Sequence, residues 1–201
     1  AKGYSLFFLW FLAFFTDSAQ KVNQIPIGKV SASITEPNYE DNKPIVPAGE
    51  RAKDPTFSNN GTVDSYIRAQ VYVPISDQIK YVDENEQIVT PTNNIELISY
   101  QINSGWEKIE EEGYTGVYED AEGNQYNVYT YKYIENGQEK MTTPGETITT
   151  PLFNKIKIIN YLDIDEGTPI EIHIAALAVQ AYDGTAEEMW QYYKNQNGTV
   201  I

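Results

Sequence analysis

The sequence contains no cysteine and a single histidine, His173. Without cysteine the chain can form no disulfide and offers no thiolate to a metal or a reaction. One histidine cannot supply a two-histidine zinc motif, and Ser-His catalysis would depend on it alone. His173 stands between two isoleucines in an alternating stretch, which favours a structural role. We therefore expect no catalytic residue, no resident cofactor and no enzyme.

Basic residues are also scarce, with 14 lysines and arginines against 29 acids and a net charge of -15. Nucleic acids and anionic lipid surfaces attract basic proteins, so the charge argues against both as partners. No glycine-rich phosphate loop occurs, because the glycines are scattered at turns.

Two acidic turns could offer oxygen ligands to calcium. One contains Asp163, Asp165 and Glu166, and the other contains Glu119, Asp120 and Glu122. Neither has the spacing of an EF-hand loop. The alternative interpretation is two solvated turns on an acidic protein, and we predict no other metal ligands.

No apolar run reaches the roughly 20 residues that a membrane-spanning helix needs. The longest run is Leu6–Phe15. Its length suits the core of a secretory signal, with Ala13 as the small residue at a cleavage point. It can also be a strand that a neighbouring subunit buries, since an exposed strand of this kind would aggregate. On the second interpretation the predicted subunit-interface residues are Leu6, Phe8, Trp10, Leu12, Phe14, Phe15, Val22, Ile25 and Ile27.

The remaining pattern is that of a β-protein. Sixteen tyrosines accompany many threonines, valines and isoleucines, which favour strands. The clearest strand is 64–75, where Ile67, Ala69, Val71 and Val73 share one face and Tyr66, Arg68, Gln70 and Tyr72 the other. Further strands are predicted at 25–36, 95–102, 114–118, 126–134, 154–159 and 169–182.

The last segment has the pattern of a helix. Thr185 and Glu188 form a capping box, and Met189, Trp190 and Tyr193 give one apolar stripe. The predicted fold class is all-β: a jelly-roll-like β-sandwich with a short C-terminal helix and an extended apolar N-terminal segment. We expect residues 1–24 to form that segment and residues 25–201 a single domain.

A few side chains suggest specific roles. Arg68 is expected to pair with a carboxylate across the sheet, and Asn59 with Gly61 to form the turn that directs the strand at 64–75. Trp106 and Trp190 are expected in the core or at its rim. The strand at 126–134 places Asn127, Tyr129, Tyr131 and Tyr133 on one face, which could bind a glycan or pack across strands.

Several segments in order resemble one family. The junction "AFFTD" at 13–17, the block "KDPTFSNNGTVDSYIRAQVYVP" at 53–74, and the late segments "TPLFNKIKI" and "IEIHIAALAVQAYDGTAEEMW" are similar to the TasA/camelysin-type proteins. Their signal peptides are removed by the SipW signal peptidase. The resemblance covers about 13–194. The residues before Ala13 depart from the family's mature start. If they persist in the mature chain, the cleavage site differs from the family's, and the N-terminal strand that a neighbouring subunit would bury is longer and more apolar.

The resemblance implies a secreted jelly-roll subunit, extracellular or on the surface of a Gram-positive cell, that assembles into biofilm-matrix filaments. The partners would be identical subunits, and the protein would contact the membrane only during export. An alternative is a monomeric surface module that binds a glycan or protein. A third possibility is a metalloprotease, because camelysin is described as cleaving casein; the single histidine argues against it.

Overall fold

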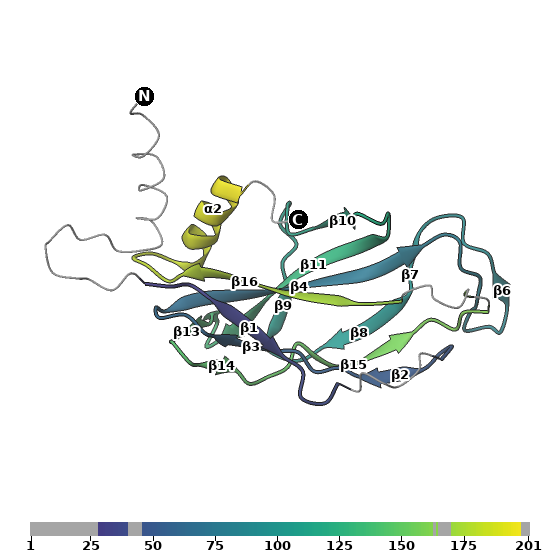
Figure 1. Ribbon diagram of the computed structural model, residues 1–201, viewed down its shortest axis with the longest axis horizontal. Helices are drawn as coiled ribbons and strands as arrows, with labels where there is room; N and C mark the ends of the chain where they lie inside the picture. The colour runs from purple at the N-terminus through teal and green to yellow at the C-terminus, as the bar shows by residue number, and fades with distance from the viewer. Residues whose placement is uncertain (1–27, 40–45, 163, 165–169, 198–201) are drawn as a thin grey trace, which may run out of the picture.

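The computed structural model describes residues 28–39, 46–162, 164 and 170–197, and these form an all-β sandwich with one C-terminal helix (Figure 1). The predicted fold class is therefore confirmed for this part of the chain. The predicted apolar N-terminal segment lies outside the described residues. No described helix has the length and apolarity needed to cross a membrane.

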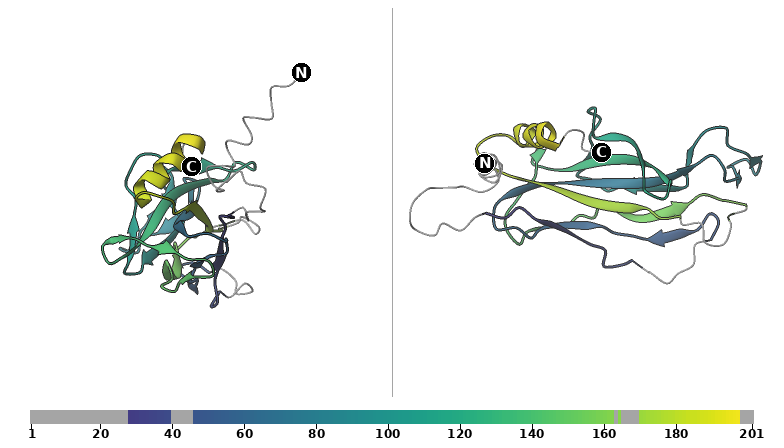
Figure 2. Two further views of the ribbon diagram at one scale, coloured as in Figure 1. Left: turned by 90° about the vertical axis from the view of Figure 1, so that its left-hand side faces the viewer. Right: turned by 45° about the horizontal axis from the view of Figure 1, so that its top comes forward.

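The described strands form one large sheet, two three-stranded sheets and one two-stranded sheet. The eight-stranded main sheet has the order β10-β11-β4-β13, with β16 and β7 also paired to β4, and β9 and β12 to β11. Across from it lie the sheets β1-β3-β14 and β2-β15-β8, and β5 pairs with β6 in a separate hairpin (Figure 2). The bounds are β1 Ala32–Thr35, β2 Glu50–Ala52, β3 Thr56–Asn59, β4 Ser65–Ser76, β5 Tyr81–Val82, β6 Ile88–Val89, β7 Ile95–Glu96, β8 Ile98–Ile102, β9 Trp106–Lys108, β10 Thr115–Glu119, β11 Gln125–Glu135, β12 Gln138–Glu139, β13 Met141–Thr142, β14 Thr147–Ile148, β15 Phe153–Ile158 and β16 His173–Gln180.

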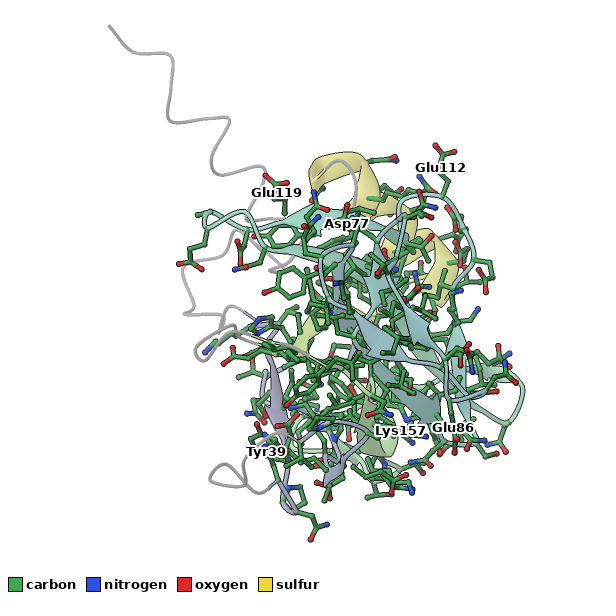
Figure 3. The ribbon with its side chains drawn as sticks, turned by 90° about the vertical axis from the view of Figure 1, so that its right-hand side faces the viewer. Tyr39, Asp77, Glu86, Glu112, Glu119 and Lys157 are labelled. Atoms are coloured by element: carbon green, nitrogen blue, oxygen red, sulfur yellow. The ribbon has the colours of Figure 1, made fainter. Side chains whose placement is uncertain are left out.

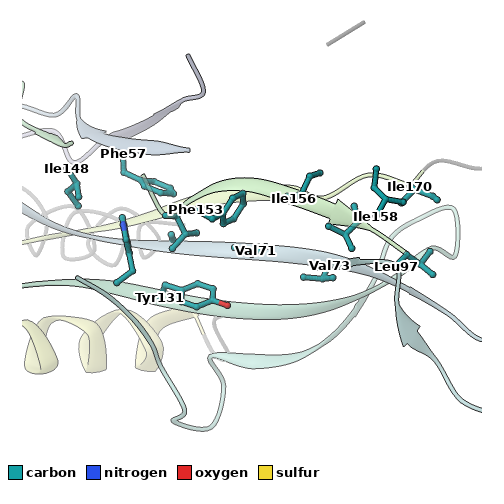
Figure 4. Packing of buried hydrophobic residues seen from close by; sticks show 14 of the residues in the cluster. Phe57, Val71, Val73, Leu97, Tyr131, Ile148, Phe153, Ile156, Ile158 and Ile170 are labelled. Carbon is teal, nitrogen blue, oxygen red and sulfur yellow. The ribbon is translucent and has the colours of Figure 1, made fainter. Parts of the chain in front are cut away.

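The core lies between the main sheet and the two small sheets. Val71 and Val73 of β4 face Phe153, Ile156 and Ile158 of β15, as Figure 4 shows. Each of these five side chains is at most 5% exposed. The predicted core-facing side of β4 is therefore confirmed, since successive side chains point to opposite faces of a strand.

The second face of β4 is buried too, which the alternating pattern does not predict. Arg68 is 1% exposed and Gln70 2% exposed, although both are polar. The reason is that β4 is a central strand whose outer face is covered near Arg68 by the helix α2 (Ala186–Asn197). A polar residue on such a face must find partners inside the protein.

The helix begins at the capping box that the sequence predicts. The Glu188 backbone N–H donates to Thr185 Oγ1 at 3.3 Å, and the Thr185 backbone N–H donates to Glu188 Oε2 at 2.7 Å. Met189 and Trp190 pack on Val179 of β16 and are 6% and 0% exposed. The expected burial of Trp190 is confirmed, as is that of Trp106, which is 4% exposed.

Short strands are the elements that the sequence pattern misses. In residues 51–63 the sequence indicates only the turn near Asn59 and Gly61, yet this range contains the end of β2 and the whole of β3. Phe57 of β3 is fully buried against Trp106. A strand of three or four residues shows too few alternations to be recognised, and its place in the sandwich comes from pairing with distant strands.

Candidate functional site

Two strand edges of the sandwich that approach each other, those of β16 and β1, are unpaired in the described structure. β16 pairs with β4 on one edge, and β1 pairs with β3 on one edge. The two strands lie near each other, yet no ladder joins them among the described residues. We call the space between these two edges the seam. Unpaired strand edges carry free N–H and C=O groups that can pair with another chain.

The seam is lined by apolar side chains that are only half buried. Ile174, Ala176 and Ala178 of β16 point inward, as do Ala32 and Ile34 of β1, and all five pack against the main core. A fully covered strand would bury such residues almost completely. The seam therefore combines an unpaired backbone edge with apolar side chains that a further strand could cover.

A cavity extends the seam beyond the start of β16. Its volume is about 330 Å³, and it lies between Ile170 and Ile172 on one side and Ile156 and Ile158 on the other. Arg51 and Lys53 also border it. The cavity has room for large apolar side chains, which distinguishes this end of the seam from the alanine-rich middle of β16.

Two buried charges hold the segment that follows β1. The Lys53 ammonium is 2.8 Å from Glu36 Oε1 and lies 4.4 Å from the centre of the Tyr39 ring. Asp54 accepts hydrogen bonds from the Asn38 backbone at 3.0 Å and from its side-chain amide at 2.6 Å. These contacts tie residues 36–39 to the chain just after β2, and Tyr39 and Lys53 both line the cavity.

The turn before β4 is built as the sequence predicts. Asn59 is fully buried, its Oδ1 accepts from the Gly61 N–H at 2.9 Å, and its Nδ2 donates to the carbonyls of Val63 and Thr142. A Cβ on Gly61 would lie 2.2 Å from the Lys29 carbonyl oxygen. Only glycine allows that approach, which brings the chain leading to β1 against this turn.

Arg68 forms the ion pair that the sequence predicts, with Glu139 of β12 as the partner. The Arg68 Nε and Nη2 donate to the two carboxylate oxygens at 3.0 and 2.8 Å. The Trp190 indole N–H donates to the same carboxylate at 2.7 Å, and the guanidinium lies 4.5 Å from the centre of the Trp190 ring. Arg68, Glu139 and Trp190, which we call the latch, thus bind α2 to the main sheet.

The tyrosine face of the strand at 126–134 turns toward the interior of the sandwich. Tyr131 is 5% exposed and shares a 2.8 Å hydrogen bond between hydroxyls with Tyr100, while Tyr133 packs on Trp106. Tyr129 is half buried, and its hydroxyl donates to Glu96. The tyrosines of this face therefore pack across strands, which is one of the two roles that the sequence predicts for them. Burial, followed by the Glu96 carboxylate, raises the pKa of Tyr129 to about 12.

The acidic turn at 119–122 is a closed structural turn. Asp120 accepts hydrogen bonds from the backbone N–H groups of Glu122 and Asn124, both at 2.9 Å, and from the Asn124 side chain at 2.8 Å. These bonds, led by the Asn124 side chain, lower the pKa of the Asp120 carboxyl. Within the described ranges no cluster of three or more acidic or histidine side chains could hold a metal ion.

The remaining predicted site residues lie outside the described residues. These are the calcium candidates Asp163, Asp165 and Glu166, and the interface residues Leu6, Phe8, Trp10, Leu12, Phe14, Phe15, Val22, Ile25 and Ile27. Both predictions therefore stay predictions.

No family model, curated protein or solved structure matches this chain. The resemblance to the TasA/camelysin-type family thus remains a prediction from the residues that carry it.

The sequence analysis did not predict the seam, although the apolar pattern of β16 indicates an unusual edge strand. Residues 174–179 are apolar at every position, "IAALAV", where an ordinary edge strand with one wet face would alternate. Such a run indicates a strand covered on both faces. Here α2 covers the outer face near Leu177 and Val179, and the inner face meets the core and the seam.

Proposed function

We propose that this protein is a secreted structural subunit that polymerises head to tail into extracellular filaments. The apolar N-terminal segment of one copy would pair as an added strand with the free edge of β16 in the next copy. This is β-augmentation, in which main-chain hydrogen bonds give adhesion and alternate side chains give specificity. The observation that carries the proposal is the unpaired edge of β16 above half-buried apolar side chains.

The proposed donor matches the chemistry of the seam. Its residues are the apolar set of Leu6–Phe15 together with Val22, Ile25 and Ile27. The inward side chains of β16 offer isoleucine and alanine surface, and the cavity near Ile170 offers space for a bulkier group. Burying about five large side chains, at roughly 1.5–3 kcal/mol each, contributes on the order of 10 kcal/mol before ordering costs.

Such a contact produces a filament rather than a closed ring or pair. The donor segment and the acceptor seam are different surfaces of the same chain, so each copy has one of each. A heterologous contact of this kind repeats from copy to copy and builds an open filament, except where the rotation between copies closes the assembly into a ring. The net charge of -15 would keep the filaments soluble and apart from one another.

The test compares the full chain with a variant that lacks residues 1–15. We expect filaments from the full chain in negative-stain microscopy and monomers from the variant in light scattering, because the donor strand is gone. A matched control replaces residues 1–15 by a glycine-serine stretch of equal length, and it should stay monomeric too. Filaments from either variant would refute the donor role, and a monodisperse full chain would refute polymerisation itself.

A further inference from the structure

A cluster of aromatic rings lies on the outer face of the main sheet, on strand segments next to α2. It consists of Tyr72 of β4, Tyr118 of β10, Tyr126 of β11 and His173 of β16, and we call it the ring patch. Ring centres are 5.5 Å apart between Tyr72 and Tyr118, 6.3 Å between Tyr118 and Tyr126, and 5.3 Å between Tyr126 and His173. Three separate parts of the chain, namely β4, the β10–β11 hairpin and β16, thus bring these rings together.

The ring patch is separate from the core and from the seam. Strand register places Tyr72 opposite His173 and Tyr118 opposite Tyr126, on the face away from Val71, Val73 and Ile174. None of the four rings packs against the main core cluster. Part of their role is structural, since Val128 between them is fully buried. Yet Tyr118 remains 42% exposed and His173 is exposed as well.

Carboxylates surround the ring patch. Asp120 Oδ2 is 3.5 Å from the Tyr126 hydroxyl, and Glu171 precedes His173 by two residues on the same chain segment. Burial raises the pKa of Tyr126, and the nearby charges of Asp120, Glu171 and Glu122 raise it further. Within the described part of the chain no ion pair joins a lysine or arginine to these three carboxylates, although Glu171 also lines the cavity that Arg51 and Lys53 border. Glu119, at the end of β10, is exposed at the protein surface in Figure 3, but it follows Tyr118 directly and therefore points to the opposite face of the strand.

Aromatic rings beside carboxylates that form no ion pair within the described part of the chain are suited to a cationic ligand with apolar faces. Ring faces attract cations and pack on C–H surface, and the carboxylates supply the opposite charge. The chain's net charge of -15 disfavours anionic polymers. The ring patch extends over an open sheet face across four strands, a shape that fits an extended polymer better than a small molecule in an enclosing pocket.

We propose that the ring patch binds an amino-sugar polysaccharide, with ammonium groups at the carboxylates and sugar rings against Tyr118, Tyr72 and His173. The proposal does not depend on polymerisation, because the ring patch and the seam use opposite faces of β16. A subunit with both surfaces would join a protein filament to a polysaccharide.

The test measures binding of a glucosamine hexamer to the full chain by calorimetry at neutral pH. Tyr118→Ala should weaken binding about tenfold, which corresponds to about 1.4 kcal/mol, because it removes the most exposed tyrosine of the patch. Tyr182→Ala is the matched control, since Tyr182 is 63% exposed and lies outside the ring patch. Glu171→Gln should weaken binding several-fold and reduce its salt dependence.

Two further probes decide the ligand class. The fully N-acetylated hexamer lacks ammonium groups and should bind much more weakly than the glucosamine hexamer. Polylysine carries ammonium groups without sugar rings, so its binding should be insensitive to Tyr118→Ala. Equal binding of the N-acetylated hexamer, equal effects of the Tyr118 and Tyr182 variants, or Tyr118-dependent binding of polylysine as tight as that of the hexamer would each overturn the proposal.

Discussion

The main sheet ends in two different edge strands, β10 on one side and β16 on the other. Four of the five residues of β10 are exposed, including Val117 at 63%. β16 has the same free edge in the described structure, but its inward side chains rest on the core. A strand added to β10 would bury isolated side chains. A strand added to β16 would instead cover apolar side chains that already pack against the core. An unpaired edge alone therefore does not mark a partner site; the apolar surface behind it does.

The two edges also differ in what holds them. β16 continues into α2, which the latch ties to β4 and β12 through Arg68, Glu139 and Trp190. On the β10 side, Lys194 of α2 reaches Glu111 at 2.7 Å near the surface. Buried charge pairs are costly to break, and surface pairs contribute little.

The largest expected effect comes from breaking the latch. Glu139→Ala should lower the free energy of unfolding by about 3–5 kcal/mol, because it leaves the Arg68 guanidinium buried without its carboxylate. Denaturant unfolding measures the loss, and hydrogen exchange should show faster opening of β16 than of β10. Glu187→Gln is the control: its carboxylate is 3.7 Å from Arg68 and 62% exposed, so a change within about 0.5 kcal/mol is expected. Equal losses in both variants would contradict the latch.

A smaller effect is expected from a charge placed on each edge. Ala176→Asp should lower stability by about 1–3 kcal/mol and abolish assembly, because a carboxylate would enter the half-buried seam. Val117→Asp adds the same charge to β10 and should change stability by less than about 0.5 kcal/mol, with assembly intact. Microscopy and denaturant titration of the pair measure both quantities. Loss of assembly in the Val117 variant alone would move the contact to β10.

The smallest effect concerns pH on the β10 side, where Tyr129 pairs with Thr115. The pKa of Tyr129 is about 12 in the folded protein, against about 10 for a free tyrosine. The folded state therefore favours the neutral phenol, and its contribution is complete below about pH 10 and lost as pH rises to about 12. Tyr129→Phe should make the denaturation midpoint less sensitive to alkali over this range. An unchanged alkaline dependence would contradict it.

Local sequence chemistry was sufficient for several elements. The alternation at 64–75 predicts β4 and its core-facing residues, and Thr185 with Glu188 predicts the start of α2. The turn at Asn59 and Gly61 and the ion pair of Arg68 were also predictable, although the identity of Glu139 was not. Glu139 lies 71 residues after Arg68 in the sequence, and no local pattern relates these two residues.

The sequence by itself determined the all-β class, the C-terminal helix, the acidic surface and the apolar character of residues 6–15, because each follows from composition or from contacts within a few residues. Only the tertiary structure decided which apolar strand stays partly uncovered. It also decided that the tyrosines at 129–133 turn inward while Tyr72, Tyr118 and Tyr126 meet outside. These outcomes depend on pairing between distant strands, where a shift of register by one residue would reverse every face.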